Sequence, residues 1–101
     1  MKHAVWSVYL LRNERNALYA GITTQIDRRL REHRGKRARA ARFTRSCREI
    51  VLVYHCGIGE RGQALKVEAR LKRLTKIKKE TIVSSEFNRT DLYHFLAMPE
   101  S

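Results

Sequence analysis

The chain has 101 residues, and 22 Lys and Arg against 10 Asp and Glu give it a formal net charge of +12. This length suits one folded domain and excludes two, and 43% hydrophobic residues exclude the composition of a disordered chain. No apolar run approaches the ~20 residues of a membrane span, and the N-terminus lacks a signal-peptide pattern. We therefore expect a folded cytoplasmic protein with an anionic partner, which the charge alone leaves open as nucleic acid, an anionic membrane surface or an acidic protein.

Two antiparallel strands are predicted first, at residues 4–12 and 17–24. Both runs are rich in β-formers, and the intervening "NERN" is typical of a turn. The first strand carries Tyr9 and the second carries Tyr19. Side chains alternate between the faces of a strand, so Gly21 shares a face with Tyr19 and is expected to leave open space beside it. Taken singly, such tyrosines are most often ordinary strand aromatics.

A helix is predicted over residues 25–34, where Ile26 and Leu30 form a buried stripe. Arg29 and His33 each follow a stripe residue by three positions, so both flank the stripe and can lean toward the sheet. The plain structural alternatives are a solvated arginine on the helix face and a helix-end histidine favoured by the helix dipole.

A strongly basic stretch comes next. Residues 34–48 contain seven Lys or Arg and no acidic residue. We expect an exposed loop that either follows a nucleic-acid backbone or only solubilises the protein, and the total charge favours the first. The candidate nucleic-acid-binding residues are Lys36, Arg37, Arg39, Arg42 and Arg45.

A third strand is predicted at residues 48–55, "REIVLVYH", and its near-continuous apolar run suggests a central or well-covered position. Cys47 and Cys56 flank this run. An extended strand would hold them about 30 Å apart, far beyond the ~7 Å that a disulfide allows. We therefore expect two free thiols, and two cysteines with scattered histidines do not make a zinc site.

The rest of the chain is predicted to be helical, at residues 59–75, 76–87 and 91–98. One face of the first helix is apolar at three-four spacing and is expected to pack on the sheet. That face consists of Ala64, Val67, Leu71 and Leu74. We expect one domain over residues 1–97 and a short C-terminal tail at 98–101.

Glu68 is the only acidic residue between Lys66 and Lys79, a stretch with seven Lys or Arg. It lies at the edge of the predicted buried face of its helix. A carboxylate there loses hydration energy unless a cation compensates, and the candidates are Lys72, an arginine or a divalent metal. The simplest alternative is an ordinary i, i+4 ion pair with Lys72.

These residue types are the ones that phosphodiester cleavage requires. The reaction needs a group that deprotonates water, a cation for the charge on the phosphoryl oxygens, and usually a metal. Tyr9 or Tyr19, Arg29 and Glu68 could supply these functions. Tyrosine has an ordinary pKa of about 10, so it would need nearby positive charge or a metal-bound water to act as the base.

The motifs "SVYLL" and "LYAGIT", an arginine ten residues after the second tyrosine and a glutamate in a later helix resemble the GIY-YIG nuclease domain. The resemblance covers nearly the whole chain and is closest to small stand-alone bacterial GIY-YIG proteins. It implies an α+β fold with a three-stranded antiparallel sheet flanked by helices.

The resemblance also implies roles for individual residues. Tyr9 and Tyr19 would lie around the attacking water, Arg29 would stabilise the phosphate, and Glu68 would bind one divalent ion, Mg²⁺ or Mn²⁺. The implied activity is a metal-dependent endonuclease acting on DNA, with no membrane partner; the sequence leaves open whether its substrate is a nicked, flap, branched or plain duplex structure. The alternatives are a nucleic-acid-binding protein that does not cleave and a basic RNA- or ribosome-associated protein.

The chain departs from the family pattern at several positions. Ser7 replaces the glycine of the first motif and Ala20 the isoleucine of the second. Many members carry a lysine where this chain has Ile22, and His33 is a plausible catalytic substitute for it. Some members use an asparagine near the C-terminus, for which Asn88 is the candidate here.

Overall fold

A three-stranded antiparallel sheet, in the order β2-β1-β3, forms the centre of the protein. The structure is a computed structural model that describes residues 4–35 and 47–100. The strands are β1 (Trp6–Asn13), β2 (Leu18–Thr23) and β3 (Ile50–Gly59). The predicted hairpin, the three-stranded sheet and the α+β class are confirmed.

The position of β3 differs from the expectation. In the described part of the chain it pairs with β1 alone and lies at the sheet edge, so of the two expected positions the central one is wrong and the well-covered one is confirmed. A register shift between Leu10 and Leu11 of β1 changes which residues of β3 face each side. As a result Leu52 packs in one core and Tyr54 in the other. The apolar run thus reflects burial on both faces of an edge strand, while Val51 is half exposed.

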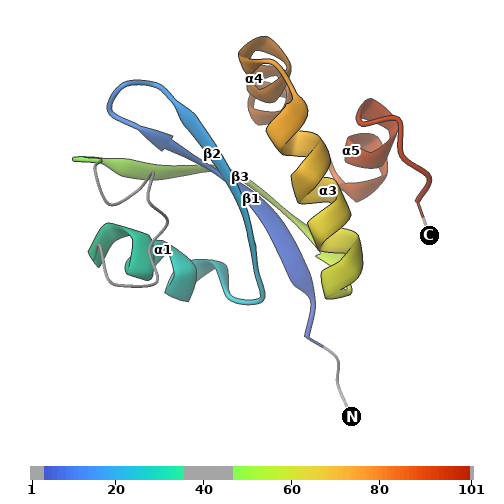
Figure 1. Cartoon of the computed structure of the whole chain (residues 1–101), viewed down its shortest axis with the longest axis horizontal. Helices are drawn as coiled ribbons and strands as arrows, with labels where there is room; N and C mark the ends of the chain where they lie inside the picture. Colours follow the sequence, from blue (N-terminus) through green and yellow to red (C-terminus); the bar gives the residue numbers. More distant parts are fainter. Residues whose placement is uncertain (1–3, 36–46, 101) are drawn as a thin grey trace.

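The helices divide between the two faces of the sheet (Figure 1). The helix α1 (Ile26–Gly35) covers one face, and α3 (Arg61–Arg73), α4 (Lys76–Ser85) and α5 (Arg89–Phe95) lie on the other. All four were predicted from the sequence, with ends that differ by a few residues. None of the helices within the described ranges is long and apolar enough to cross a membrane.

Two hydrophobic cores result because β1 is buried on both sides. Toward α3, α4 and α5, the fully buried Val8 and Leu10 meet the predicted apolar face of α3. Toward α1, Leu11 packs with Ile26 and Leu30, the predicted stripe. Burying a large aliphatic side chain contributes about 1.5–3 kcal/mol, so β1 is the strand on which both cores depend.

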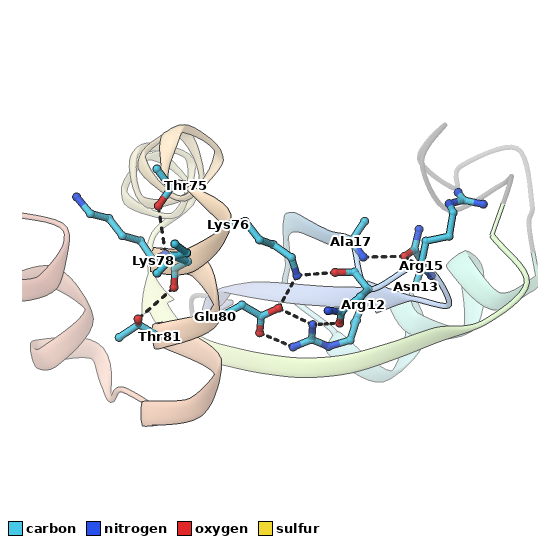
Figure 2. Close-up of polar contacts among 11 residues, drawn as sticks. Arg12, Asn13, Arg15, Ala17, Thr75, Lys76, Lys78, Glu80 and Thr81 are labelled. Atoms are coloured by element: carbon cyan, nitrogen blue, oxygen red, sulfur yellow. Dashed lines mark hydrogen bonds and ion pairs between the residues drawn. The ribbon is translucent and has the colours of Figure 1, made fainter.

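An ion-pair cluster ties the end of β1 to α4 (Figure 2). Both guanidinium amino groups of Arg12 donate to the Glu80 carboxylate at 2.6 Å. The Lys76 ammonium also contacts Glu80 and the backbone carbonyl of Asn16. Hydrogen bonds from Arg12 and then Lys76 lower the pKa of Glu80 to about 2. The carboxylate is therefore charged at any physiological pH, and the hairpin stays joined to α4.

Cys47 and Cys56 form no disulfide, as predicted, and both are buried. Cys47 accepts a 3.5 Å contact from the side-chain amide of Asn13. The Asn13 side-chain oxygen accepts backbone N–H groups of Arg15 and Ala17 at 3.0 and 2.9 Å. One buried asparagine therefore shapes the β1–β2 turn and contacts the segment that leads into β3.

The helix α5 is fixed at both ends by local hydrogen bonds. Asn88, the asparagine candidate, is its N-cap and accepts the Asp91 N–H at 2.8 Å. Past its C-terminus, Ala97 adopts a left-handed conformation with φ of 56°. The Met98 N–H then donates to the Tyr93 carbonyl at 3.0 Å. This is a Schellman turn with alanine at the position that glycine favours.

Replacing Ala97 with glycine should therefore stabilise the protein. The left-handed conformation costs an L-residue about 1–2 kcal/mol, and part of this gain is lost to the greater freedom of glycine in the unfolded chain. We expect the free energy of unfolding of Ala97→Gly to rise by about 0.5–1 kcal/mol in urea denaturation.

Ala69→Gly is the matched control, because Ala69 is exposed in the interior of α3. There the same substitution should lower the free energy of unfolding by about 1 kcal/mol. Equal destabilisation by both substitutions would show that the left-handed turn carries no strain.

Candidate active site

The register of the β1–β2 pair brings the two tyrosines together. Tyr9 lies opposite Gly21, and Leu11 lies opposite Tyr19. Cross-strand partners project from the same face of a sheet, so both phenols lie on the face covered by α1. Tyr9 is buried, with 3% of its surface exposed, whereas Tyr19 is partly exposed.

Gly21 provides the space that the Tyr9 ring occupies. A Cβ atom at Gly21 would lie 2.3 Å from the Tyr9 hydroxyl oxygen and 2.5 Å from Cζ. Such distances are far inside van der Waals contact, so no side chain fits while Tyr9 keeps this position. The expectation that Gly21 leaves open space beside Tyr19 is wrong, because the ring of Tyr9 fills that space.

His33 of α1 joins the two tyrosines. Its side chain is fully buried, and its Nε2 lies 3.0 Å from the Tyr9 hydroxyl oxygen. Its ring lies edge-on to both phenols, with centroid distances of 6.0 Å to Tyr9 and 5.7 Å to Tyr19. His33 lies in the last turn of α1, so the alternative of a helix-end histidine favoured by the helix dipole stays open.

The protonation states of this pair follow from burial. Loss of hydration, helped by the nearby charge of Arg29, lowers the pKa of His33 to about 4. Burial also raises the pKa of Tyr9, against the opposing effects of Arg29. At neutral pH the site thus holds a neutral phenol hydrogen-bonded to a neutral imidazole.

Arg29 supplies the positive charge of the site. It is hydrogen-bonded to Tyr9, an interaction that opposes the rise in the Tyr9 pKa. One turn further along α1, Glu32 accepts from Arg29 at 3.1 Å, and both side chains are 22% exposed. The sequence analysis missed Glu32, although its i, i+3 spacing from Arg29 is a signal for such a pair.

Glu68 projects from α3 at the edge of its buried face, as predicted. Its side chain is 17% exposed, and its carboxylate lies 3.5 Å from the Lys72 ammonium. Its negative charge contributes to the raised pKa of Tyr9, which couples it electrostatically to the phenol. The predicted i, i+4 pair is present, and because Lys72 is 54% exposed this pair contributes at most about 1 kcal/mol to stability.

Glu68 is the carboxylate proposed to bind a metal ion. No group of three or more potential ligands lies close enough to hold an ion within residues 4–35 and 47–100. Mg²⁺ commonly binds to one or two carboxylates and completes its coordination with water and substrate phosphate oxygens. Glu68 fits such a site, in which the substrate supplies part of the coordination.

Four of the predicted site residues lie close together in the structure. Their spacing in the sequence alone did not show that they would meet. Tyr9, Tyr19, Arg29 and His33 form one cluster, and Glu68 acts on it electrostatically. The predicted basic residues Lys36, Arg37, Arg39, Arg42 and Arg45 lie outside the described residues.

Comparison with known proteins decides the family. Residues 5–81 match the family model described as the GIY-YIG catalytic domain. The chain belongs to the GIY-YIG family. Membership of this family indicates a nuclease-type function on nucleic acid, and the resemblance inferred from the tyrosine motifs is confirmed.

Several relatives of this GIY-YIG domain have a similar length. A UPF0213 protein of Pectobacterium carotovorum is 45% identical over 87 residues, which cover 85% of each chain. A UPF0213 protein of Yersinia enterocolitica is 45% identical over 86 residues, covering 85% of this chain and 87% of that protein. The solution NMR structure of a UPF0213 protein from Bacillus halodurans has a TM-score of 0.53 and 27% identity, with 94% of this chain and 99% of that one covered.

Substituting Gly21 by alanine should displace the Tyr9 ring and break its hydrogen bond to His33. Forcing an extra methyl group into a filled space costs about 1–3 kcal/mol, so we expect the free energy of unfolding of Gly21→Ala to fall by that amount. The measurement is urea denaturation followed by circular dichroism.

Gly62→Ala serves as the control, since a Cβ at Gly62 meets no atom within 4 Å and Gly62 lies in α3. It should be neutral or stabilising by up to about 1 kcal/mol, because alanine favours the helix. Unchanged stability of Gly21→Ala would contradict the close approach of Tyr9.

The buried His33 should make stability depend on pH. Its pKa is about 4 in the folded protein and 6.5 in the unfolded chain, so between these values the unfolded chain binds the extra proton. The free energy of unfolding should therefore fall by up to about 3 kcal/mol as the pH drops from 6.5 to 4.

Carboxylates titrate in the same window, so the test compares wild type with His33→Gln. The glutamine variant should show a shallower fall in the free energy of unfolding from pH 6.5 to 4, measured by urea denaturation at each pH. Parallel curves for the two proteins would mean that His33 titrates normally.

Proposed function

We propose that this GIY-YIG domain is a metal-dependent endonuclease that hydrolyses phosphodiester bonds of DNA. One observation carries the proposal: the 3.0 Å contact between the hydroxyl of Tyr9 and Nε2 of His33, beside Arg29. A buried hydroxyl needs a hydrogen-bond partner, and here that partner is a neutral imidazole, which can also accept a proton. A proton acceptor next to a phenol and a cation is what water attack on a phosphate requires.

In this mechanism Tyr9 and His33 act as a relay. Tyr9 donates to the unprotonated Nε2 of His33, in the tautomer that carries its proton on Nδ1. As water attacks phosphorus, its proton passes to the Tyr9 oxygen and the phenolic proton passes to Nε2. Tyr9 never carries a full negative charge, which suits a buried phenol whose pKa is raised.

Substrate itself would make His33 a better base. A free site holds the imidazole neutral because burial and Arg29 both disfavour its charged form. A phosphate bound against Arg29 brings negative charge close to the imidazole, and such a charge favours the protonated form. The pKa of His33 should therefore rise when the nucleic acid binds.

Arg29, Tyr19 and Glu68 complete the proposed site. The guanidinium of Arg29 has five N–H donors, so it can keep its bond to Glu32 and still bind a phosphoryl oxygen. Tyr19 borders the same water position from the more exposed strand. A divalent ion bound by Glu68 would polarise the phosphate and the leaving oxygen. The basic residues between 36 and 46 would hold the backbone beyond the cleaved bond.

A second function has support from two observations. Burial raises the pKa of Tyr9, and Glu32 neutralises part of the charge of Arg29. Both features suit a protein that binds nucleic acid, DNA or RNA, on this scaffold and does not cleave it. The two functions differ in cleavage. Loss of the Glu68 carboxylate should abolish cleavage by a nuclease, whereas a protein that only binds has no cleavage to lose.

The decisive test is cleavage of labelled single-stranded, duplex and branched DNA with Mg²⁺ or Mn²⁺ by wild type and Glu68→Gln. The amide keeps the shape of the carboxylate but loses its charge, so we expect cleavage to fall at least a hundredfold while DNA binding, measured in EDTA, stays within about twofold. Losses of this size follow from removing electrostatic stabilisation of a transition state.

Glu86→Gln is the matched control, because Glu86 is exposed at the end of α4, and it should cleave as wild type does. Cleavage that persists in Glu68→Gln would reject the metal assignment. Binding without cleavage by wild type on every substrate would favour the second function.

A further inference from the structure

A surface groove lies between the C-terminal part of α3, the first turn of α4 and the C-terminal part of α5, and it shares no residue with the candidate active site. Its apolar floor consists of Leu74, Phe95 and Leu96, and its rim carries the cations Arg70, Arg73 and Lys78. The volume of about 380 Å³ lies within the range of small-ligand sites. We call this feature the three-helix groove.

The rim has uncompensated positive charge. No acidic side chain is among the described residues that line the groove, and Arg73 and Lys78 form no ion pair with any described residue. Both side chains are exposed. Figure 2 shows Lys78 extending from α4 away from the cluster of Lys76 and Glu80. Lys78 therefore takes no part in the ion pair of that helix.

Arg70 is held in place by the protein. One of its amino groups donates to the Leu96 carbonyl at 3.2 Å, beside the left-handed turn at Ala97. This bond uses one of five N–H donors, and the remaining donors of the guanidinium can bind an anion. An anchored arginine loses less side-chain entropy on binding than a freely rotating one.

The floor adds an aromatic side chain to these cations. Phe95 is partly exposed and packs against Phe87 at a centroid distance of 5.2 Å, so its position is fixed from behind. An aromatic side chain beside several cations is the combination that binds unpaired nucleotides, because bases stack and phosphates pair with the charges. An acidic peptide would use the cations but would gain little from a phenylalanine floor.

We propose that the three-helix groove binds an unpaired stretch of a nucleic-acid strand, with a base against Phe95 and phosphates at Arg73 and Lys78. This inference rests on the proposed function for the nucleic-acid partner but uses none of its catalytic residues. A single-stranded segment bound there, away from the tyrosine cluster, would favour substrates in which a duplex continues into a single strand.

The test is fluorescence anisotropy with labelled twelve-nucleotide oligothymidylate, in EDTA, over a range of salt concentrations. Each phosphate contact contributes about 0.7 to the salt slope for a single strand, so Arg73→Gln/Lys78→Gln should lower that slope by about 1.4. The control Arg15→Gln/Arg61→Gln removes the same charge from sites outside the groove and should leave the slope nearly unchanged. Equal effects of the two double variants would overturn the inference.

Base stacking is tested separately with Phe95→Leu and an abasic strand of the same length. Stacking on one aromatic contributes about five- to a hundredfold in affinity, so wild type should prefer the strand with bases and Phe95→Leu should lose that preference. Urea denaturation checks that Phe95→Leu is folded. The double variant Arg73→Gln/Lys78→Gln changes only exposed side chains, so it tests the groove even if Phe95→Leu does not fold. Equal binding of abasic and normal strands by wild type would overturn the stacking.

Two further outcomes separate the possibilities. An oligoglutamate peptide of equal charge that binds as tightly as the oligonucleotide, and loses affinity in Arg73→Gln/Lys78→Gln, would make the groove a site for acidic peptides and overturn the proposal. Absence of cleavage by wild type would reject the nuclease while leaving the groove result intact. Wild-type affinity of the groove variant would reject the groove whatever the cleavage result.

Discussion

The close approach of Tyr9 to Gly21 is the constraint on which the rest of the structure depends. Tyr9 lies on the central strand, which is buried on both faces, so its ring has no room to move away. Only a residue without a Cβ can lie opposite it on β2. This contact directs the phenol toward α1, where His33 meets its hydroxyl group. The side chain that fixes the packing of this face is therefore also the one that contacts His33.

Burial has two opposite consequences at this site. It stabilises the small core around Tyr9 and Leu11 through loss of apolar surface from water. It also disfavours every charged form inside that core, which keeps the phenol protonated and the imidazole neutral. A proton can move between such groups only when an external charge changes their balance. In the proposed mechanism a bound phosphate supplies that charge.

The cations of the protein fall into two groups, those in ion pairs and those without one among the described residues. Glu80 pairs with Arg12 and so joins β1 to α4, and Glu32 pairs with Arg29 within α1. Arg73 and Lys78 have no such partner among the described residues. A net charge of +12 therefore includes cations that hold the fold together and cations that are free to bind phosphate. Counting lysines and arginines does not separate these two groups.

The sequence alone determined the succession of strands and helices along the chain, the apolar face of α3, the lack of a disulfide between Cys47 and Cys56, and the family, because these depend on local periodicity, on chain separation and on short motifs. It left a central and a well-covered position open for β3, of which the second holds, and it was wrong about the open space at Gly21. Strand order and the filling of a space depend on which segments meet, and a register shift at Leu10 moved the pattern of β3. The sequence named Tyr9 and His33 separately, but their hydrogen bond joins residues 24 positions apart. Only the tertiary structure decided that bond, the Arg12–Glu80 pair and the protonation of His33, because distance and burial arise when the chain has folded.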